Sequence, residues 1–145
     1  MHNNLFLVDT SAWLLVLRQT FIPKAKDRID HLLKEDVIIT TGIVKLEILS
    51  GTRTDKEFQR LKMRLDALGT VETDDSLWQK ACELGFKLRR RGITVPHTDI
   101  LIGACALKTA STILHADSHY DMMAKHTKLK VESWVKVAKA LQSQK

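Results

Sequence analysis

The stretch LFLVDTSAWLL (residues 5–15) places an aspartate, Asp9, directly after a short apolar run. That run, LFLV (5–8), is continuous, as expected of a strand covered on both faces of a parallel sheet. Asp9, Thr10 and Ser11 offer side chains that cap a helix, and AWLLVL continues as that helix. The stretch predicts a strand, a turn and a helix, with an acid at the carboxyl end of the strand.

The same alternation of short apolar runs and amphipathic stretches continues along the chain. DVIIT (36–40), STILHAD (111–117) and LKVES (129–133) read as further strands, and Gly51 is placed to end the helix after the second strand. Apolar residues at helical spacing predict further helices on Phe58, Leu61, Leu65 and Leu68, on Leu77, Ala81, Leu84 and Leu88, and on Trp134, Val137, Ala138 and Leu141. Strands that alternate with helices predict an α/β fold with a parallel sheet. Without a repeat or linker, we expect one domain over residues 1–145.

Composition narrows the classes of protein. A chain of 145 residues, 44% hydrophobic, is long enough for one domain with a full core. Cys82 and Cys105 fall in apolar helical patterns without disulfide or zinc spacing, so we expect reduced core residues in a cytoplasmic protein. The start MHNN resembles no secretory leader, and no apolar run approaches the ~20 residues of a membrane span, so no membrane association is expected.

The chain carries 23 Lys and Arg against 17 Asp and Glu, a net charge of +6. A basic balance suits a polyanionic partner such as RNA, or an acidic protein.

Three acids are placed to meet at one edge of the predicted sheet. Asp9 and Asp117 each end a strand, and the carboxyl edge of a parallel sheet is where ligands bind. Glu47 lies four residues after Ile43 and three after Val44, which predicts that it shares the inward face of its helix.

A fourth acid, Asp99, follows Pro96 at the start of an apolar helix, where a carboxylate is stabilised by the helix N-terminus. Each acid has a structural alternative. Asp9 and Asp99 would cap helices, Glu47 would pair with a buried arginine, and Asp117 would end a strand in a turn.

Taken together, the four acids point to a metal site. Two carboxylates about 4 Å apart repel by about 4 kcal/mol at an effective dielectric constant of about 20, so such a cluster needs protons or cations. Oxygen ligands without His or Cys favour Mg²⁺ or Mn²⁺. We predict a site for Mg²⁺ or Mn²⁺ formed by Asp9, Glu47, Asp99 and Asp117.

Four segments in this order resemble the PIN-domain ribonucleases, in particular the VapC-type toxins of toxin-antitoxin pairs. They are LFLVDTSAWL, KLEILSG, HTDILIGACAL and ILHADSHYDMMA, and together they span most of the chain. The resemblance implies a three-layer sandwich with a parallel sheet of about five strands. It further implies a metal-dependent endoribonuclease toxin with an RNA substrate, a cognate antitoxin and a homodimeric assembly.

The resemblance maps the acidic quartet of the family onto the same four acids, and assigns Ser11 to support the first of them. The last motif departs from the family pattern Thr-x-Asp-x-Asp-Phe, because His115, His119 and Tyr120 stand at the Thr, second Asp and Phe positions. Asp121 is therefore a candidate substitute or helper for Asp117, with a helix-start role as the alternative.

The histidines are expected in the core or in support of the acids, because no pair has zinc-site spacing on a helix. We expect basic side chains at the rim of the acid site to bind RNA. The candidates are Lys87, Arg89, Arg90, Arg91, Lys125, Lys128 and Lys130. The alternative function is a catalytically silent PIN-like module that binds RNA or protein, for which little Mg²⁺ or Mn²⁺ affinity is expected.

Overall fold

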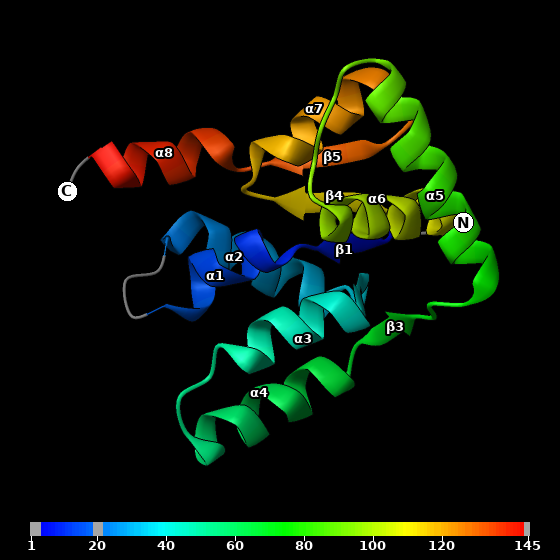
Figure 1. Cartoon of the computed structure of the whole chain (residues 1–145). Coiled ribbons are helices and arrows are strands. Elements are labelled where there is room, and N and C mark those ends of the chain that lie inside the picture. The colour runs from blue at the N-terminus through cyan, green and yellow to red at the C-terminus, as the bar shows by residue number, and fades with distance from the viewer. Residues whose placement is uncertain (1–3, 19–21, 144–145) are drawn as a thin grey trace.

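The computed structural model describes residues 4–18 and 22–143 (Figure 1). Its strands are β1 (Phe6–Val8), β2 (Ile38–Thr41), β3 (Gly69–Val71), β4 (Thr112–His115) and β5 (Lys130–Ser133). Its helices are α1 (Thr10–Leu17), α2 (Pro23–Lys34), α3 (Gly42–Ser50), α4 (Asp55–Asp66), α5 (Asp75–Arg90), α6 (His97–Thr109), α7 (Ser118–His126) and α8 (Val135–Ser143).

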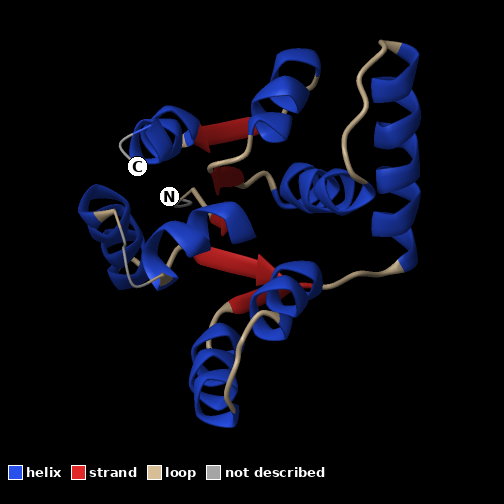
Figure 2. Ribbon diagram, turned by 60° about the vertical axis from the view of Figure 1, so that its left-hand side comes forward, coloured by secondary structure: helices blue, strands red, loops and turns tan. Residues whose placement is uncertain are grey.

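The five strands form one parallel sheet in the order β3-β2-β1-β4-β5, so β1 lies at its centre. Helices α5 and α6 lie on one side of the sheet, and α1 and α2 lie on the other (Figure 2). The predicted α/β class and its parallel sheet of five strands are confirmed.

Burial follows from this layering. Leu7 and Val8 of β1 and Ile113 of β4 are fully buried, because helices cover both faces of the central strands. Helix α6 is buried from Leu101 to Ala106 and packs mainly against α5. The sheet and α6 form a packed frame that fixes the side chains at their ends.

Several local predictions need correction. β3 was not located from the sequence, because its three residues Gly69–Val71 give too short a pattern. β4 ends at His115 rather than at residue 117. Cys82 is exposed, because it lies one position outside the buried stripe of α5, whereas Cys105 is buried as expected.

Helix α2 was also not located from the sequence, and α7 was indicated only by the helix-start role considered for Asp121, which lies in its first turn. Among the described residues, no helix is both long and apolar enough to cross a bilayer.

Candidate active site

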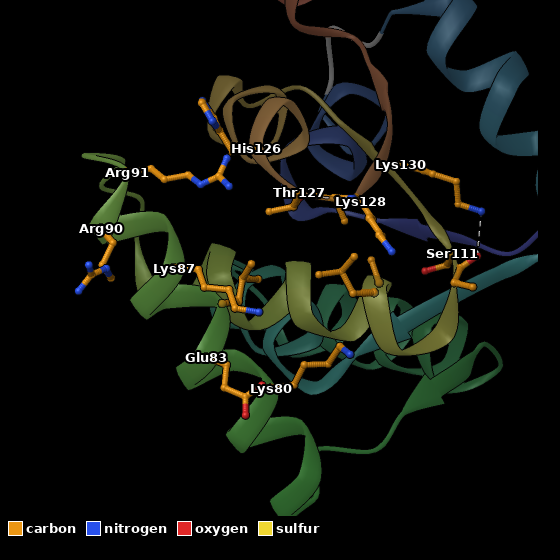
Figure 3. A pocket seen from close by; sticks show the side chains of 15 residues that line it. Lys80, Glu83, Lys87, Arg90, Arg91, Ser111, His126, Thr127, Lys128 and Lys130 are labelled. Atoms are coloured by element: carbon orange, nitrogen blue, oxygen red, sulfur yellow. Dashed lines mark hydrogen bonds between the residues drawn. The ribbon is translucent and has the colours of Figure 1, made fainter.

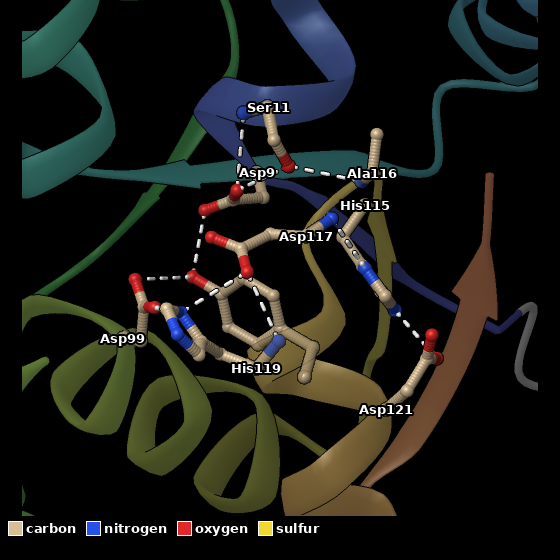
Figure 4. Close-up of polar contacts among 9 residues, drawn as sticks. Asp9, Ser11, Asp99, His115, Ala116, Asp117, His119 and Asp121 are labelled. Carbon is tan, nitrogen blue, oxygen red and sulfur yellow. Dashed lines mark hydrogen bonds and ion pairs between the residues drawn. The ribbon is translucent and has the colours of Figure 1, made fainter. Parts of the chain in front are cut away.

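The carboxyl edge of the sheet brings two strand-end aspartates close together. Val8 of β1 is in register with Leu114 of β4, and the backbone N–H of Asp9 donates to the Leu114 carbonyl at 2.9 Å. Asp117 follows β4 and is the N-cap of α7, where its carboxylate accepts the N–H of His119 at 2.9 Å. Both aspartates therefore cap helices and also face one site (Figure 4).

The first turn of α6 carries Asp99 into the same site. One ligand atom from each of Asp99, Asp117 and His119 lies within 4.8 Å of the other two. His119 Nδ1 is 3.0 Å from Asp99 Oδ2 and 3.0 Å from Asp117 Oδ1. An imidazole nitrogen therefore lies among the carboxylates, beside the oxygen donors that the sequence predicted.

The buried carboxylate of Asp9, which is only 5% exposed, is fully hydrogen-bonded. Its Oδ2 accepts the backbone N–H of Ser11 at 3.0 Å and the Ser11 hydroxyl at 2.6 Å. The same hydroxyl oxygen accepts the N–H of Ala116 at 2.9 Å, which ties the start of α1 to the turn after β4. These bonds compensate the cost of burying a charged group.

Tyr120 joins Asp9 to Asp99 through its hydroxyl group. The hydroxyl oxygen lies 2.7 Å from Asp9 Oδ1 and 3.3 Å from Asp99 Oδ1, and its single proton serves one of them at a time. Burial, together with the two carboxylates, raises the pKa of Tyr120 far above its usual range. The side chain therefore stays a neutral donor.

The electrostatics of Asp99 reflect this crowding of acids. Partial burial raises the pKa of Asp99 above its ordinary value, and the charges of Asp117 and Asp9 raise it further. His119 acts in the opposite direction. Burial and neighbouring like charges both disfavour the charged form of a carboxyl group, which raises its pKa.

Glu47 lies beside this cluster rather than inside it. The prediction that it faces inward is wrong, because Val44 and Ile48 form the buried stripe of α3 and Glu47 is exposed. Its Oε1 accepts the Thr10 hydroxyl at 3.0 Å, which turns it toward the start of α1. Partial desolvation and the charge of Asp9 raise the pKa of Glu47, although the Thr10 bond lowers it.

Asp121 points away from the cluster. It lies in the first turn of α7, and its carboxylate contacts His115 Nε2 at 3.2 Å and accepts the Ser133 hydroxyl at 2.8 Å. His115 is fully buried, and its Nδ1 accepts the N–H of Asp117 at 3.1 Å, which places the ring proton on Nε2. Burial lowers the pKa of His115, so the ring is neutral and supports the turn before α7.

Most of the candidate RNA-binding residues lie away from the acids, whereas the prediction placed them at the rim of the acid site. Five of them, Lys87, Arg90, Arg91, Lys128 and Lys130, line a groove whose floor is the last turn of α6 and the start of β4. Asp99 lies at the opposite end of α6. Arg89 faces a separate hollow between α5 and α6, and Lys125 lines neither.

The sequence analysis placed His119 and Tyr120 at positions of the family motif, but it did not predict that His119 contacts Asp99 and Asp117 or that Tyr120 contacts Asp9 and Asp99. Because Asp117 is an N-cap, the residues two and three positions later lie in the first turn of α7, beside the capping carboxylate. A strand-end aspartate followed by polar or aromatic residues was the signal that could have found them.

Comparison with known proteins agrees with this geometry. Residues 6–126 match the family model described as "PIN domain". The VapC ribonuclease Mb1587 of Mycobacterium bovis is 31% identical over 134 residues, which are 90% of this chain and 99% of that protein. Ribonuclease VapC21 of Mycobacterium tuberculosis is 29% identical over 133 residues, 90% of this chain and 93% of that protein.

Solved structures share the fold. VapBC2 from Rickettsia felis, bound to a promoter DNA fragment, matches with a TM-score of 0.74 at 18% identity, over 90% of this chain and 98% of that one. DNA-bound VapBC from Salmonella typhimurium matches with a TM-score of 0.74 at 14% identity, over 91% of this chain and 99% of that one. The chain therefore belongs to the PIN-domain family, in which VapC ribonucleases are among its relatives.

Proposed function

We propose that this chain is a divalent-metal-dependent endoribonuclease and the toxin of a toxin-antitoxin pair. The observation that carries the proposal is the cluster of Asp99, Asp117 and His119 beside Asp9, in a chain related to VapC ribonucleases. One donor atom from each of two carboxylates and an imidazole lies within 4.8 Å of the others. The carboxylates suit Mg²⁺ and Mn²⁺ alike, whereas the nitrogen is accepted more readily by Mn²⁺ than by Mg²⁺, which prefers oxygen.

Each side chain has a proposed role. Asp99, Asp117, His119 and Asp9 would hold the ion, and Glu47 would act as a further ligand or orient the attacking water. A bound divalent ion lowers the pKa of its water and neutralises charge on the phosphate oxygens. Because the cluster contains no activated side-chain nucleophile, water is the attacking group in phosphodiester hydrolysis.

Ser11 and Tyr120 would keep Asp9 ionised and fixed in this scheme. Ser11 donates twice to one carboxylate oxygen and Tyr120 donates to the other. Hydrogen bonds to the charged form favour it over the protonated form. The oxygen that faces Tyr120 is the one directed toward Asp99, where an ion would be shared.

The role of Glu47 is testable with a matched pair of variants. Glu47→Gln should weaken Mn²⁺ binding roughly ten-fold and slow RNA cleavage, since it removes a charge that faces Asp9. Glu57→Gln is the control, because Glu57 lies on α4 and accepts the N–H of Arg53, which Gln also does. Calorimetric titration of both variants with Mn²⁺ measures the difference. Equal affinities would show that Glu47 is not part of the metal site.

The same titration of the unaltered protein separates the enzyme from the silent module. An enzyme of this design should bind Mn²⁺ and cut RNA only when the ion is present. A protein that folds but takes up neither Mn²⁺ nor Mg²⁺ would favour the silent module.

We further propose a small antitoxin as partner, a cytoplasmic location and a homodimeric form. The solved relatives include toxin-antitoxin complexes, and the net charge of +6 favours an acidic antitoxin segment. Expression of this chain alone should arrest bacterial growth, and co-expression of the antitoxin should restore it. Colony counts measure both effects.

The control for growth arrest is Asp9→Asn. Asparagine can accept from Ser11 through its oxygen and donate to Tyr120 through its nitrogen, so the fold should persist. Growth should then continue without the antitoxin. Unimpaired growth on strong expression of the folded, metal-binding parent chain would contradict the toxin role.

A further inference from the structure

A basic groove of about 810 Å³ lies at the end of α6 away from the acids (Figure 3). Its floor includes Ala106 and Leu107 of α6 and Ala110, which caps the C-terminus of that helix. One wall is formed by α5, and the other by residues 126–130, which join α7 to β5. The groove is therefore built from different segments than the acid site.

Positive charge is concentrated on the groove, and in the part of the chain that the structure describes Lys130 is the only one of its charged residues whose side chain donates a hydrogen bond, to the Ala110 carbonyl at 3.2 Å. Its basic lining residues are Lys80, Lys87, Arg90, Arg91, His126, Lys128 and Lys130, against the single acid Glu83. Within residues 4–18 and 22–143, no lysine or arginine of this lining forms an ion pair. By contrast, Arg28 and Lys108, which lie outside the groove, are paired with Glu132 and Asp74.

We infer that this groove binds the phosphate backbone of RNA, outside the segment that is cut. The inference rests on the proposed function, because it assigns a second contact to the same substrate. Unpaired lysines and arginines bind phosphates by releasing counterions, whereas the carboxylates of the acid site repel them. Much of the affinity for RNA must then come from basic side chains away from the acids.

The shape of the groove favours a long polyanion. Lys80 and Arg90 are ten positions apart along α5, which is roughly 15 Å of helix axis. Lys128 and Lys130 face them from the other wall (Figure 3). Positive charge along both walls suits a continuous phosphate backbone better than a single small anion.

The position of the groove restricts the substrate. Between Asp99 and the floor residues 106–110 there is roughly 10–16 Å of α6. An RNA that contacts both sites must cover that distance in addition to the length that each site occupies. The substrate class is therefore an extended or folded RNA, and short oligonucleotides occupy one site at a time.

Charge reversal in the groove tests the inference. The double variant Lys87→Glu/Lys128→Glu should bind a mixed-sequence hairpin RNA at least ten-fold more weakly than the unaltered chain at low salt. The slope of log affinity against log salt should fall by about two, one for each lost phosphate contact. Fluorescence anisotropy in EDTA measures binding without cleavage, so the result does not depend on the proposed catalysis.

The matched control is Lys56→Glu/Arg60→Glu, which changes the net charge equally at exposed positions of α4. It should keep most of the affinity for the hairpin. In Mn²⁺, the unaltered chain and the α4 control should both cut a short single-stranded RNA if the chain is a ribonuclease. Absence of cleavage by the unaltered chain would refute the proposed function and leave the binding result unaffected.

Equal hairpin affinity of the groove variant and the α4 control would overturn the inference. So would loss of binding to polyglutamate with unchanged binding to RNA, because that result identifies the groove as a site for an acidic protein.

Discussion

Replacing Asp99 by asparagine should reduce metal-dependent RNA cleavage roughly 100-fold or more, because it removes a charged ligand from the cluster. The exchange preserves the shape of the site. The asparagine nitrogen can donate to His119 Nδ1, which lies 3.0 Å from the present Oδ2, and its oxygen can accept from the Tyr120 hydroxyl. Cleavage of a labelled RNA in Mg²⁺ and in Mn²⁺ measures the loss.

The same variant should raise the Tm of the metal-free protein by a few degrees. The pKa of Asp99 is raised in the folded chain by burial, and then by Asp117 and Asp9, so the folded state binds its proton more tightly than the unfolded state does. Stability of the parent chain should therefore fall as pH rises from the ordinary carboxyl value through the raised pKa. At pH values above the raised pKa, the gain in stability from Asp99→Asn is complete. At pH values below the ordinary carboxyl pKa, the variant and the parent chain have similar stability.

Thermal denaturation in EDTA across a series of pH values tests this sign. Asp75→Asn is the control, since Asp75 also lies in the first turn of a helix but is exposed and away from the cluster. If Asp75→Asn raises the Tm as much as Asp99→Asn does, the increase in Tm is not specific to the site. Cleavage by Asp99→Asn at the parental rate would remove Asp99 from the proposed mechanism.

His119→Ala should lower Mn²⁺ affinity at least about ten-fold, with a smaller effect on Mg²⁺. Mn²⁺ accepts imidazole ligands more readily than Mg²⁺, which prefers oxygen and retains its waters. His119→Asp places an oxygen ligand at the same position of α7 and should shift the preference toward Mg²⁺. Calorimetric titration measures both affinities, and electron spin resonance of bound Mn²⁺ detects the nitrogen.

The control for this second prediction is His126→Ala, at the far end of α7. It should leave both metal affinities unchanged. If His119→Ala binds Mn²⁺ as tightly as the parent and the nitrogen signal persists, His119 is a neighbour of the site and not a ligand.

The strand-end aspartates were predictable because their placement depends on topology alone. Asp9 and Asp117 follow apolar runs that form strands. Neighbouring parallel strands bring their carboxyl ends together at one edge of the sheet. Asp99 was predictable from the apolar helix that it starts. These three positions need no knowledge of side-chain contacts.

Other features depend on tertiary packing that the sequence does not display. Glu47 lies at the margin of the apolar face of α3, and that face is wide enough for the helix to pack in either of two orientations. In the structure Ile48 packs into the core, which leaves Glu47 exposed. The basic residues were predicted at the rim of the acid site because sequence spacing does not show which end of α6 they contact. Only the crossing of α5 over α6 decides that question.

The first turn of α7 positions several side chains of the site at once. It carries His119 and Tyr120, and it is capped by the Asp117 carboxylate. A partner that rotated this turn slightly would move the His119 imidazole and the Tyr120 hydroxyl out of the site. The Asp117 carboxylate that caps the turn would move with them. Such a partner would disarm the site without covering Asp9 or Asp99, and the sheet beneath would remain intact.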